Sequence, residues 1–152
     1  MGEVYKLAPA WSVAEQIRQV FDHWRVTLGH ARARLDATRS RTVRAMLEAG
    51  YSVDDLKLAI DGCACSDWHR GKNDRSTVYD GLGLICRDAE HVDRFMEIGE
   101  RARARNSAKR ELEAWQKANR DAPRQPKRPM PEHLKRTVRA YLGKKNDEET
   151  PQ

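Results

Sequence analysis

Residues 41–63 read RTVRAMLEAGYSVDDLKLAIDGC. This stretch decides the fold because apolar side chains recur at helical spacing on both sides of a Gly50-Tyr51 junction. Gly50 is a natural helix end, and Ser52 with Asp55 has the pattern of a capping box at a helix start. The stretch therefore predicts two short helices joined by a tight corner. Their apolar faces hold Val43, Met46 and Leu47, then Val53, Leu56, Ile60 and Cys63.

The same signals predict further helices on both sides of this pair. Ser12 and Glu15 form another capping box, and the apolar positions after it run at helical spacing to Gly29. Asp88 is the cap candidate of a later segment, which Gly99 either ends or only weakens. We find no strand alternation and no hairpin signal, so the sequence predicts an all-α fold.

The expected organisation is a small helical bundle with a basic C-terminal helical arm and a linker broken by proline. We place the bundle at residues 10–98, a basic helix extension at 99–122, a Pro-rich linker at 123–131 and a terminal amphipathic helix at 132–143. Prolines disfavour helix in the linker, and Pro131 suits the first position of the last helix.

Charge separates the body from the arm. Residues 1–100 hold 14 Lys and Arg against 16 Asp and Glu, whereas residues 101–145 hold 15 against 4. Three acids follow in residues 146–152, and the whole chain has a net charge of +6. The body is therefore near neutral, while the field of the arm attracts polyanions.

The basic arm predicts binding to nucleic acid. Arginine suits phosphate because its planar guanidinium donates two parallel hydrogen bonds, and two aromatic residues in the arm are candidates for stacking on the bases of a single strand. Membrane-surface binding fits less well, because the arm lacks a broad apolar face. An acidic protein partner, and self-association through Leu112 and Trp115, are the alternatives. The predicted contacts are Arg101, Arg103, Arg105, Lys109, Arg110, Trp115, Lys117, Arg120, Arg124, Lys127, Arg128, Lys135, Arg136, Arg139 and Tyr141.

A second basic cluster surrounds the start of the helix that follows Asp36. It is either an anion-binding surface or ordinary surface arginine, and it consists of Arg32, Arg34, Arg39, Arg41 and Arg44. The next predicted helix, residues 52–63, does not suit the DNA major groove because its acidic residues would repel phosphate. These acids are Asp54, Asp55 and Asp61.

Residues 64–77 lack apolar periodicity and predict a polar loop. Trp68, like Trp24, is expected to pack, as large aromatic side chains do. Gly71 and Asn73 tolerate left-handed backbone, so we expect a loop of defined shape that exposes a histidine. Two arginines of the second cluster complete the predicted partner surface, which is Trp68, His69, Arg70, Asn73, Arg39 and Arg41.

No complete catalytic or metal site emerges from the sequence. Zinc-compatible side chains are present without a C-x-x-C pair, and they are Cys63, Cys65, His69, Cys86 and His91. Asp67, Asp88 and Asp93 lie near the two histidines in sequence, but no nucleophile, base and orienting group are combined. We therefore predict a protein that is not an enzyme and has neither metal nor cofactor.

Three stretches carry a family resemblance: FDHWR (21–25), RLDATRSRTVRAMLEAGYSVDDLKLAIDGCACSDWHRGKND (34–74) and YDGLGLICRDAEHVDRF (79–95). They resemble the C-terminal domain of bacteriophage replication proteins, of the DnaD-like replisome-organiser and helicase-loader type. The resemblance implies a helical domain that binds single-stranded DNA and helps recruit a replicative helicase. Family members often carry an N-terminal winged helix, which we do not expect here because only residues 1–11 precede the first predicted helix.

The function expected from charge and resemblance together is that of a phage-type DNA replication accessory protein. It would bind single-stranded DNA and contact a replicative helicase or its loader. The alternative is a small phage or prophage protein that binds a host complex and inhibits or redirects it. We find no signal peptide and no apolar stretch long enough to cross a bilayer, so we expect the cytoplasm of a bacterial host cell.

Overall fold

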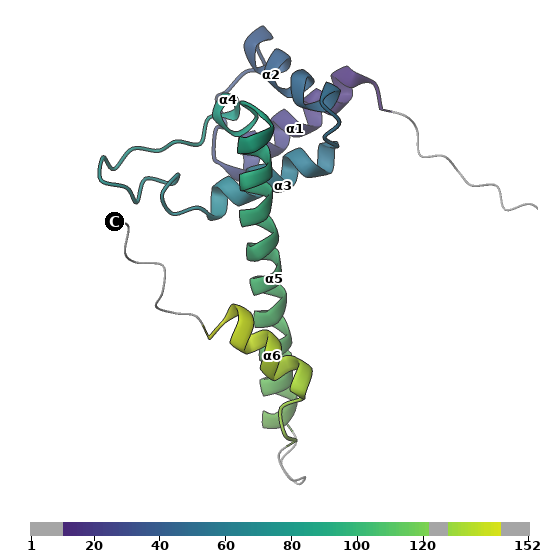
Figure 1. Cartoon of the computed structure of the whole chain (residues 1–152), viewed down its shortest axis with the longest axis vertical. Coiled ribbons are helices and arrows are strands. Elements are labelled where there is room, and N and C mark those ends of the chain that lie inside the picture. Colours follow the sequence, from purple (N-terminus) through teal and green to yellow (C-terminus); the bar gives the residue numbers. More distant parts are fainter. Residues whose placement is uncertain (1–10, 122–127, 144–152) are drawn as a thin grey trace, which may run out of the picture. The chain divides into compact units, whose positions relative to one another are not determined.

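The computed structural model describes residues 11–121 and 128–143, which hold six helices and no strand (Figure 1). The predicted all-α fold with a small helical bundle is confirmed. The helices are α1 (Val13–Thr27), α2 (Ala37–Glu48), α3 (Val53–Cys65), α4 (Leu82–Ile85), α5 (Ala89–Arg120) and α6 (Glu132–Tyr141).

The chain divides into two compact units, Met1–Gly99 and Glu100–Gln152, which we call unit 1 and unit 2. The division falls inside α5. From the sequence, Gly99 could either end this helix or only weaken it, and it lies within the helix. Arg124, Lys127 and most of the Pro-rich linker lie outside the described residues.

The predicted caps begin the helices of unit 1. Ser12 and Ser52 each complete a capping box, at the start of α1 and of α3. The carboxylate of Asp36 accepts a hydrogen bond of 2.8 Å from the backbone N–H of Arg39 at the start of α2. Gly50 has a φ of 104°, so the corner between α2 and α3 uses the left-handed backbone that glycine permits.

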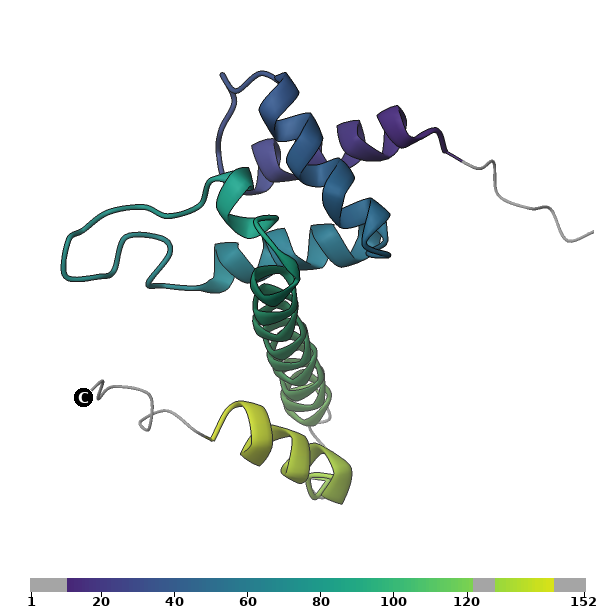
Figure 2. The same ribbon diagram turned by 45° about the horizontal axis from the view of Figure 1, so that its top comes forward.

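The core of unit 1 forms around α3, which packs against α1 and α4 (Figure 2). The buried face of α3 includes Leu56, Ala59 and Ile60, none of which is exposed to solvent. A helix with so much of its surface in the core could not enter a DNA groove. Other elements contribute Val20, Phe21, Trp24, Val43, Met46, Leu82, Ile85, Val92 and Phe95 to the core.

Two glycines let the first turns of α5 approach α3 backbone to backbone. A Cβ atom on Gly62 would lie 1.8 Å from the carbonyl oxygen of Phe95, and one on Gly99 would lie 2.6 Å from that of Leu58. No side chain fits in either space. Gly99 therefore serves packing at a point where the helix continues.

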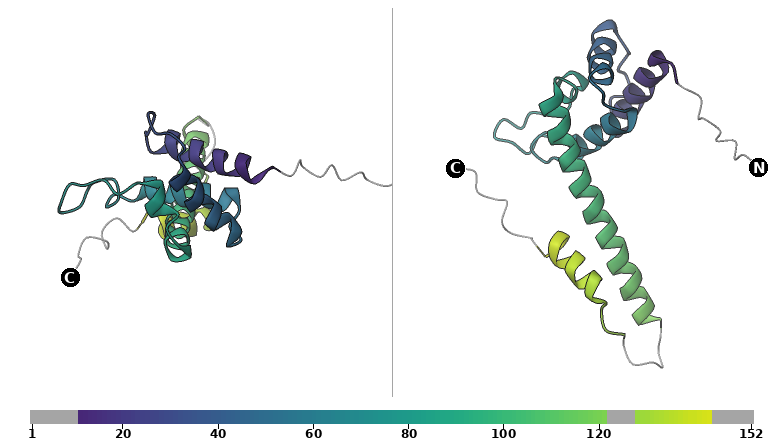
Figure 3. Two further views of the ribbon diagram at one scale, coloured as in Figure 1. Left: turned by 90° about the horizontal axis from the view of Figure 1, so that it is seen from above. Right: turned by 45° about the vertical axis from the view of Figure 1, so that its right-hand side comes forward.

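Unit 2 contains the second part of α5 and the shorter helix α6, which folds back beside it (Figure 3). Ala108 and Leu134, at 0% and 3% exposure, are its buried hydrophobic residues among those described. The sequence predicted Pro131 as the first residue of α6, but Pro131 is its N-cap and the helix begins at Glu132. The side-chain amide of Asn119 donates a hydrogen bond of 3.0 Å to the carbonyl oxygen of Arg128 and so helps to hold the two ends of the hairpin.

Candidate nucleic-acid interface

The predicted basic residues of unit 2 lie on its surface. Within the described part of the chain, all of them are exposed, and they are Arg101, Arg103, Arg105, Lys109, Arg110, Lys117, Arg120, Arg128, Lys135, Arg136 and Arg139. Helical geometry sorts those on α5. Arg103, Arg110 and Lys117 recur every seven residues and therefore share one face, opposite the buried Ala108.

Few of these cations are neutralised by other residues that the structure describes. Lys109 lies 3.9 Å from a Glu113 carboxylate oxygen, and Lys135 lies 2.6 Å from one of Glu132. Arg101 and Arg103 also make an interaction. Among residues 100–121 and 128–143, no carboxylate pairs with Arg105, Arg110, Lys117, Arg120, Arg128, Arg136 or Arg139. Their guanidinium and ammonium groups remain available to an external anion.

The two predicted stacking residues of unit 2 differ in exposure. Tyr141 is 43% exposed at the end of α6, so its ring is available to a base. Trp115 is half-buried, and its indole nitrogen is shielded from solvent without a hydrogen-bond partner among the described residues. Its helical position explains this, because seven residues separate Trp115 from Ala108 and place both on one face of α5.

The loop between α3 and α4 projects from unit 1 (Figures 1 and 2). Its aromatic residues reverse our expectation. Trp68, expected to pack, is 53% exposed and stacks on Tyr79 at a ring-centroid distance of 5.1 Å. His69, expected to be exposed, is half-buried, with its ring edge-on to Phe95 at 4.7 Å. Burial lowers the pKa of His69 below its ordinary value.

The loop has the defined shape that the sequence predicted. Gly71 has a φ of 99° and takes the left-handed backbone as expected. Asn73 acts differently, because its side chain holds the loop closed. Its Nδ2 donates to the carbonyl oxygens of Trp68 and Thr77 at 2.7 and 2.6 Å, while its Oδ1 accepts from the backbone N–H groups of Arg75 and Thr77.

Asp80 is a residue that the sequence analysis missed. It is only 6% exposed, and its two carboxylate oxygens lie 3.0 Å from Nε2 of His30 and 3.1 Å from a guanidinium nitrogen of Arg70. Its carbonyl oxygen accepts a 2.8 Å hydrogen bond from the indole N–H of Trp24. Arg70, predicted as a partner contact, is therefore also a structural residue. A buried acid could have been suspected here, because Asp80 is the charged residue in the otherwise uncharged stretch Tyr79–Leu82.

Arg39 and Arg41, which we predicted for the partner surface, differ in their contacts. The guanidinium of Arg39 lies over the ring of Trp24, with its central carbon 5.5 Å from the ring centroid, and so reaches the group of residues around Asp80. Arg41 is exposed on α2, and within the described residues its side chain has no hydrogen bond or ion pair.

Two of the three cysteines and two of the acids that we considered for a metal or catalytic site have structural roles, whereas Cys65 is exposed. Burial raises the pKa of the Cys63 and Cys86 thiols to about 12. Asp88 accepts from the backbone N–H of His91 at the start of α5, and Asp93 accepts a 2.6 Å hydrogen bond from Tyr51. The described residues contain no group of three or more side chains that could hold a metal ion.

Comparison with known proteins assigns no function to this arrangement. No protein-family model, curated protein or solved structure matches the chain. Within the described residues, no helix is both long and apolar enough to cross a membrane. The resemblance to phage replication proteins therefore stays a prediction.

Proposed function

We propose that the protein binds single-stranded DNA through unit 2 and acts as a phage-type replication accessory protein that contacts a replicative helicase or its loader. The DNA-binding part rests on the exposed cations of unit 2 that no described carboxylate neutralises, from Arg105 on α5 to Arg139 on α6. Such a surface gains free energy when it meets a row of phosphates, because condensed counterions are released from the nucleic acid.

A single strand fits this surface better than a lipid membrane does. The apolar residues that an interfacial helix would insert in lipid are turned inward here, since Leu134 and Ala108 are buried. The exposed ring of Tyr141 adds a stacking surface to unit 2, and every base offers a face to such a ring. The replication role rests on the sequence resemblance.

A salt titration with a labelled oligothymidylate tests the DNA-binding proposal. The logarithm of affinity should fall linearly with the logarithm of salt concentration, by about 0.7 per phosphate contacted. Replacing Arg105, Arg110, Arg136 and Arg139 by Gln should reduce this slope by about 3. The matched control replaces the same number of exposed arginines in unit 1, namely Arg18, Arg75, Arg87 and Arg94. Equal effects in the two variants, or an affinity independent of salt, would overturn the proposal.

A protein-interaction module that inhibits or redirects a host complex is the second candidate. The observation that favours it is Trp68, a half-exposed indole fixed by stacking and by the closed loop around Asn73. Rigid, exposed tryptophans are common centres of binding energy in protein interfaces. If Trp68→Ala abolishes binding to a purified bacterial replicative helicase while DNA affinity is unchanged, the loop is a protein-binding surface. A helicase whose activity falls on binding would then favour the inhibitor.

A further inference from the structure

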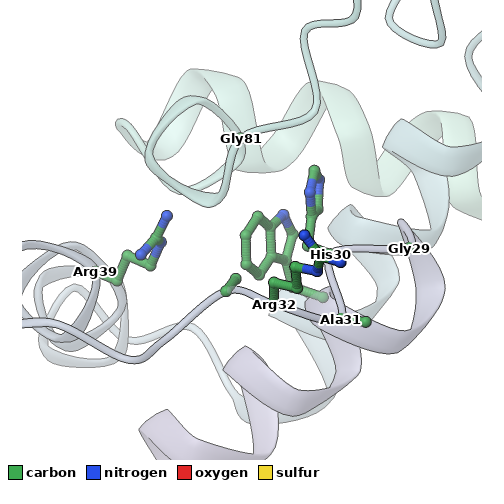
Figure 4. Close-up of a pocket in the computed structure, with 8 residues that line it drawn as sticks. Gly29, His30, Ala31, Arg32, Arg39 and Gly81 are labelled. Atoms are coloured by element: carbon green, nitrogen blue, oxygen red, sulfur yellow. The ribbon is translucent and has the colours of Figure 1, made fainter.

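Unit 1 contains an open pocket of ≈530 Å³ at the end of α1 (Figure 4). The connection from α1 to α2 forms one side, and Gly81, at the start of α4, forms another. Its volume falls within the range of about 300–1,000 Å³ that holds small organic ligands. The lining residues are Trp24, Gly29, His30, Ala31, Arg32, Ala33, Arg39 and Gly81.

The lining of the pocket includes two arginines and a histidine and no acid. Two acids, Asp80 and Asp36, lie outside the lining, and each already pairs with a basic side chain that lines the pocket. Asp80 is held between His30 and Arg70, and Asp36 caps α2 and pairs with one nitrogen of Arg39. The side chain of Arg32 is exposed and has no hydrogen bond or ion pair with any described residue. The pocket therefore favours an anion.

Arg39 is oriented before any ligand binds. Its Nη1 atom donates to the carbonyl oxygen of Arg34 and to Asp36, both at 2.8 Å. Its guanidinium lies over the Trp24 ring, and Nε and Nη2 have no partner within the described part of the chain. A fixed guanidinium with two unused nitrogens offers the fork that a phosphate group accepts.

We propose that this pocket binds the phosphate of a nucleotide, with Arg32 and Arg39 donating to the phosphate oxygens. The volume exceeds that of a phosphate alone, and the His30 ring, stacked on Trp24 at 4.4 Å, provides a flat wall for the attached base. The nucleotide is either free or one unit of a DNA strand. The second source rests on the proposed function and would extend the DNA contact from unit 2 to this pocket.

The test follows the side-chain N–H signals of Arg32, Arg39 and Trp24 by NMR in the full chain. Thymidine 5′-monophosphate, inorganic phosphate and an oligothymidylate are titrated separately. We expect thymidine monophosphate to shift these signals and to bind more tightly than inorganic phosphate. Arg32→Gln should weaken binding of the mononucleotide about tenfold, the effect of one charged hydrogen bond.

Arg18→Gln is the matched control, because Arg18 is an exposed arginine on the first half of α1 and does not line the pocket. It should leave affinity for the mononucleotide unchanged. Pocket signals that do not move with either nucleotide ligand, or equal effects of the two variants, would overturn the inference. The proposed function would survive that result if the oligothymidylate still bound with the expected salt dependence. If the mononucleotide binds here but the strand binds nowhere, the pocket stands and the proposed function fails.

Discussion

The two units of this chain obtain their structure in different ways. Unit 1 surrounds a core to which α1 through the first turns of α5 all contribute, and its sequence carries almost balanced charge. Unit 2 has two buried apolar residues among those described, Ala108 and Leu134, and many exposed cations. Burial of apolar surface provides the main stabilisation of a fold, so unit 1 should hold most of the stability. Unit 2 can therefore carry repelling charge at little cost to the fold.

Gly62→Ala should have the largest effect and would break unit 1. The added Cβ meets the backbone oxygen of Phe95 at 1.8 Å, so α3 and α5 would have to separate. We expect the free energy of unfolding to fall by about 3–5 kcal/mol in urea denaturation followed by circular dichroism. The control is Gly83→Ala, because nothing lies within 4 Å of that Cβ position. If Gly62→Ala left the free energy of unfolding unchanged, α3 and α5 would not approach each other this closely at Gly62.

Leu134→Ala should affect unit 2 alone. It removes the buried side chain of α6 and keeps every charge, so α6 should lose about 2 kcal/mol of local stability. Amide hydrogen exchange would show this as faster exchange in Glu132–Tyr141, with protection in α3 unchanged. If α3 also exchanged faster, the stability of the two units would be coupled and the contrast between them would be weaker than we infer.

Asn73→Ala should loosen one loop of unit 1 and spare its core. Loss of the hydrogen bonds to Trp68, Arg75 and Thr77 should cost about 1–2 kcal/mol, felt mainly between α3 and α4. Fluorescence quenching of Trp68 by acrylamide, in a chain where the other tryptophans are replaced by Phe, would measure the change. Asn73→Asp keeps the acceptor and loses the two donors, so it should give an intermediate effect.

Acid should have the smallest effect, and it should act on unit 1. Hydrogen bonds from Ser52 lower the pKa of Asp55 from its ordinary value of 3.8. Because the folded pKa is depressed, the stabilisation is present above the unfolded pKa and is lost as pH falls through the folded one. As the pH falls from neutral through the folded pKa of Asp55, the Tm of the wild type should therefore drop by about 1–3 °C more than the Tm of Asp55→Asn. An identical acid profile in wild type and Asp55→Asn would contradict this role of the carboxylate.

The sequence predicted the helical segments of unit 1 well because their signals are local. Caps at Ser12, Asp36 and Ser52 act within three residues of the helix start, and apolar periodicity spans a few turns. It did not predict which way the residues of the α3–α4 loop face. Trp68 and His69 are neighbours of similar local preference, and the place of His69 depends on Phe95, far along the chain.

The starts of α1, α2 and α3 and the concentration of positive charge in the C-terminal part were determined by the sequence itself, since both depend on residues close together in the chain. The close approach at Gly62, the linkage through Asp80 and the arginine-lined pocket were decided only by tertiary structure. The indole of Trp24 and the carbonyl of Asp80 stand 56 positions apart, and no local preference brings them together. Packing of the core does so, because the Trp24 indole is buried where α1 packs against α3 and its N–H then needs an acceptor, which the Asp80 carbonyl provides.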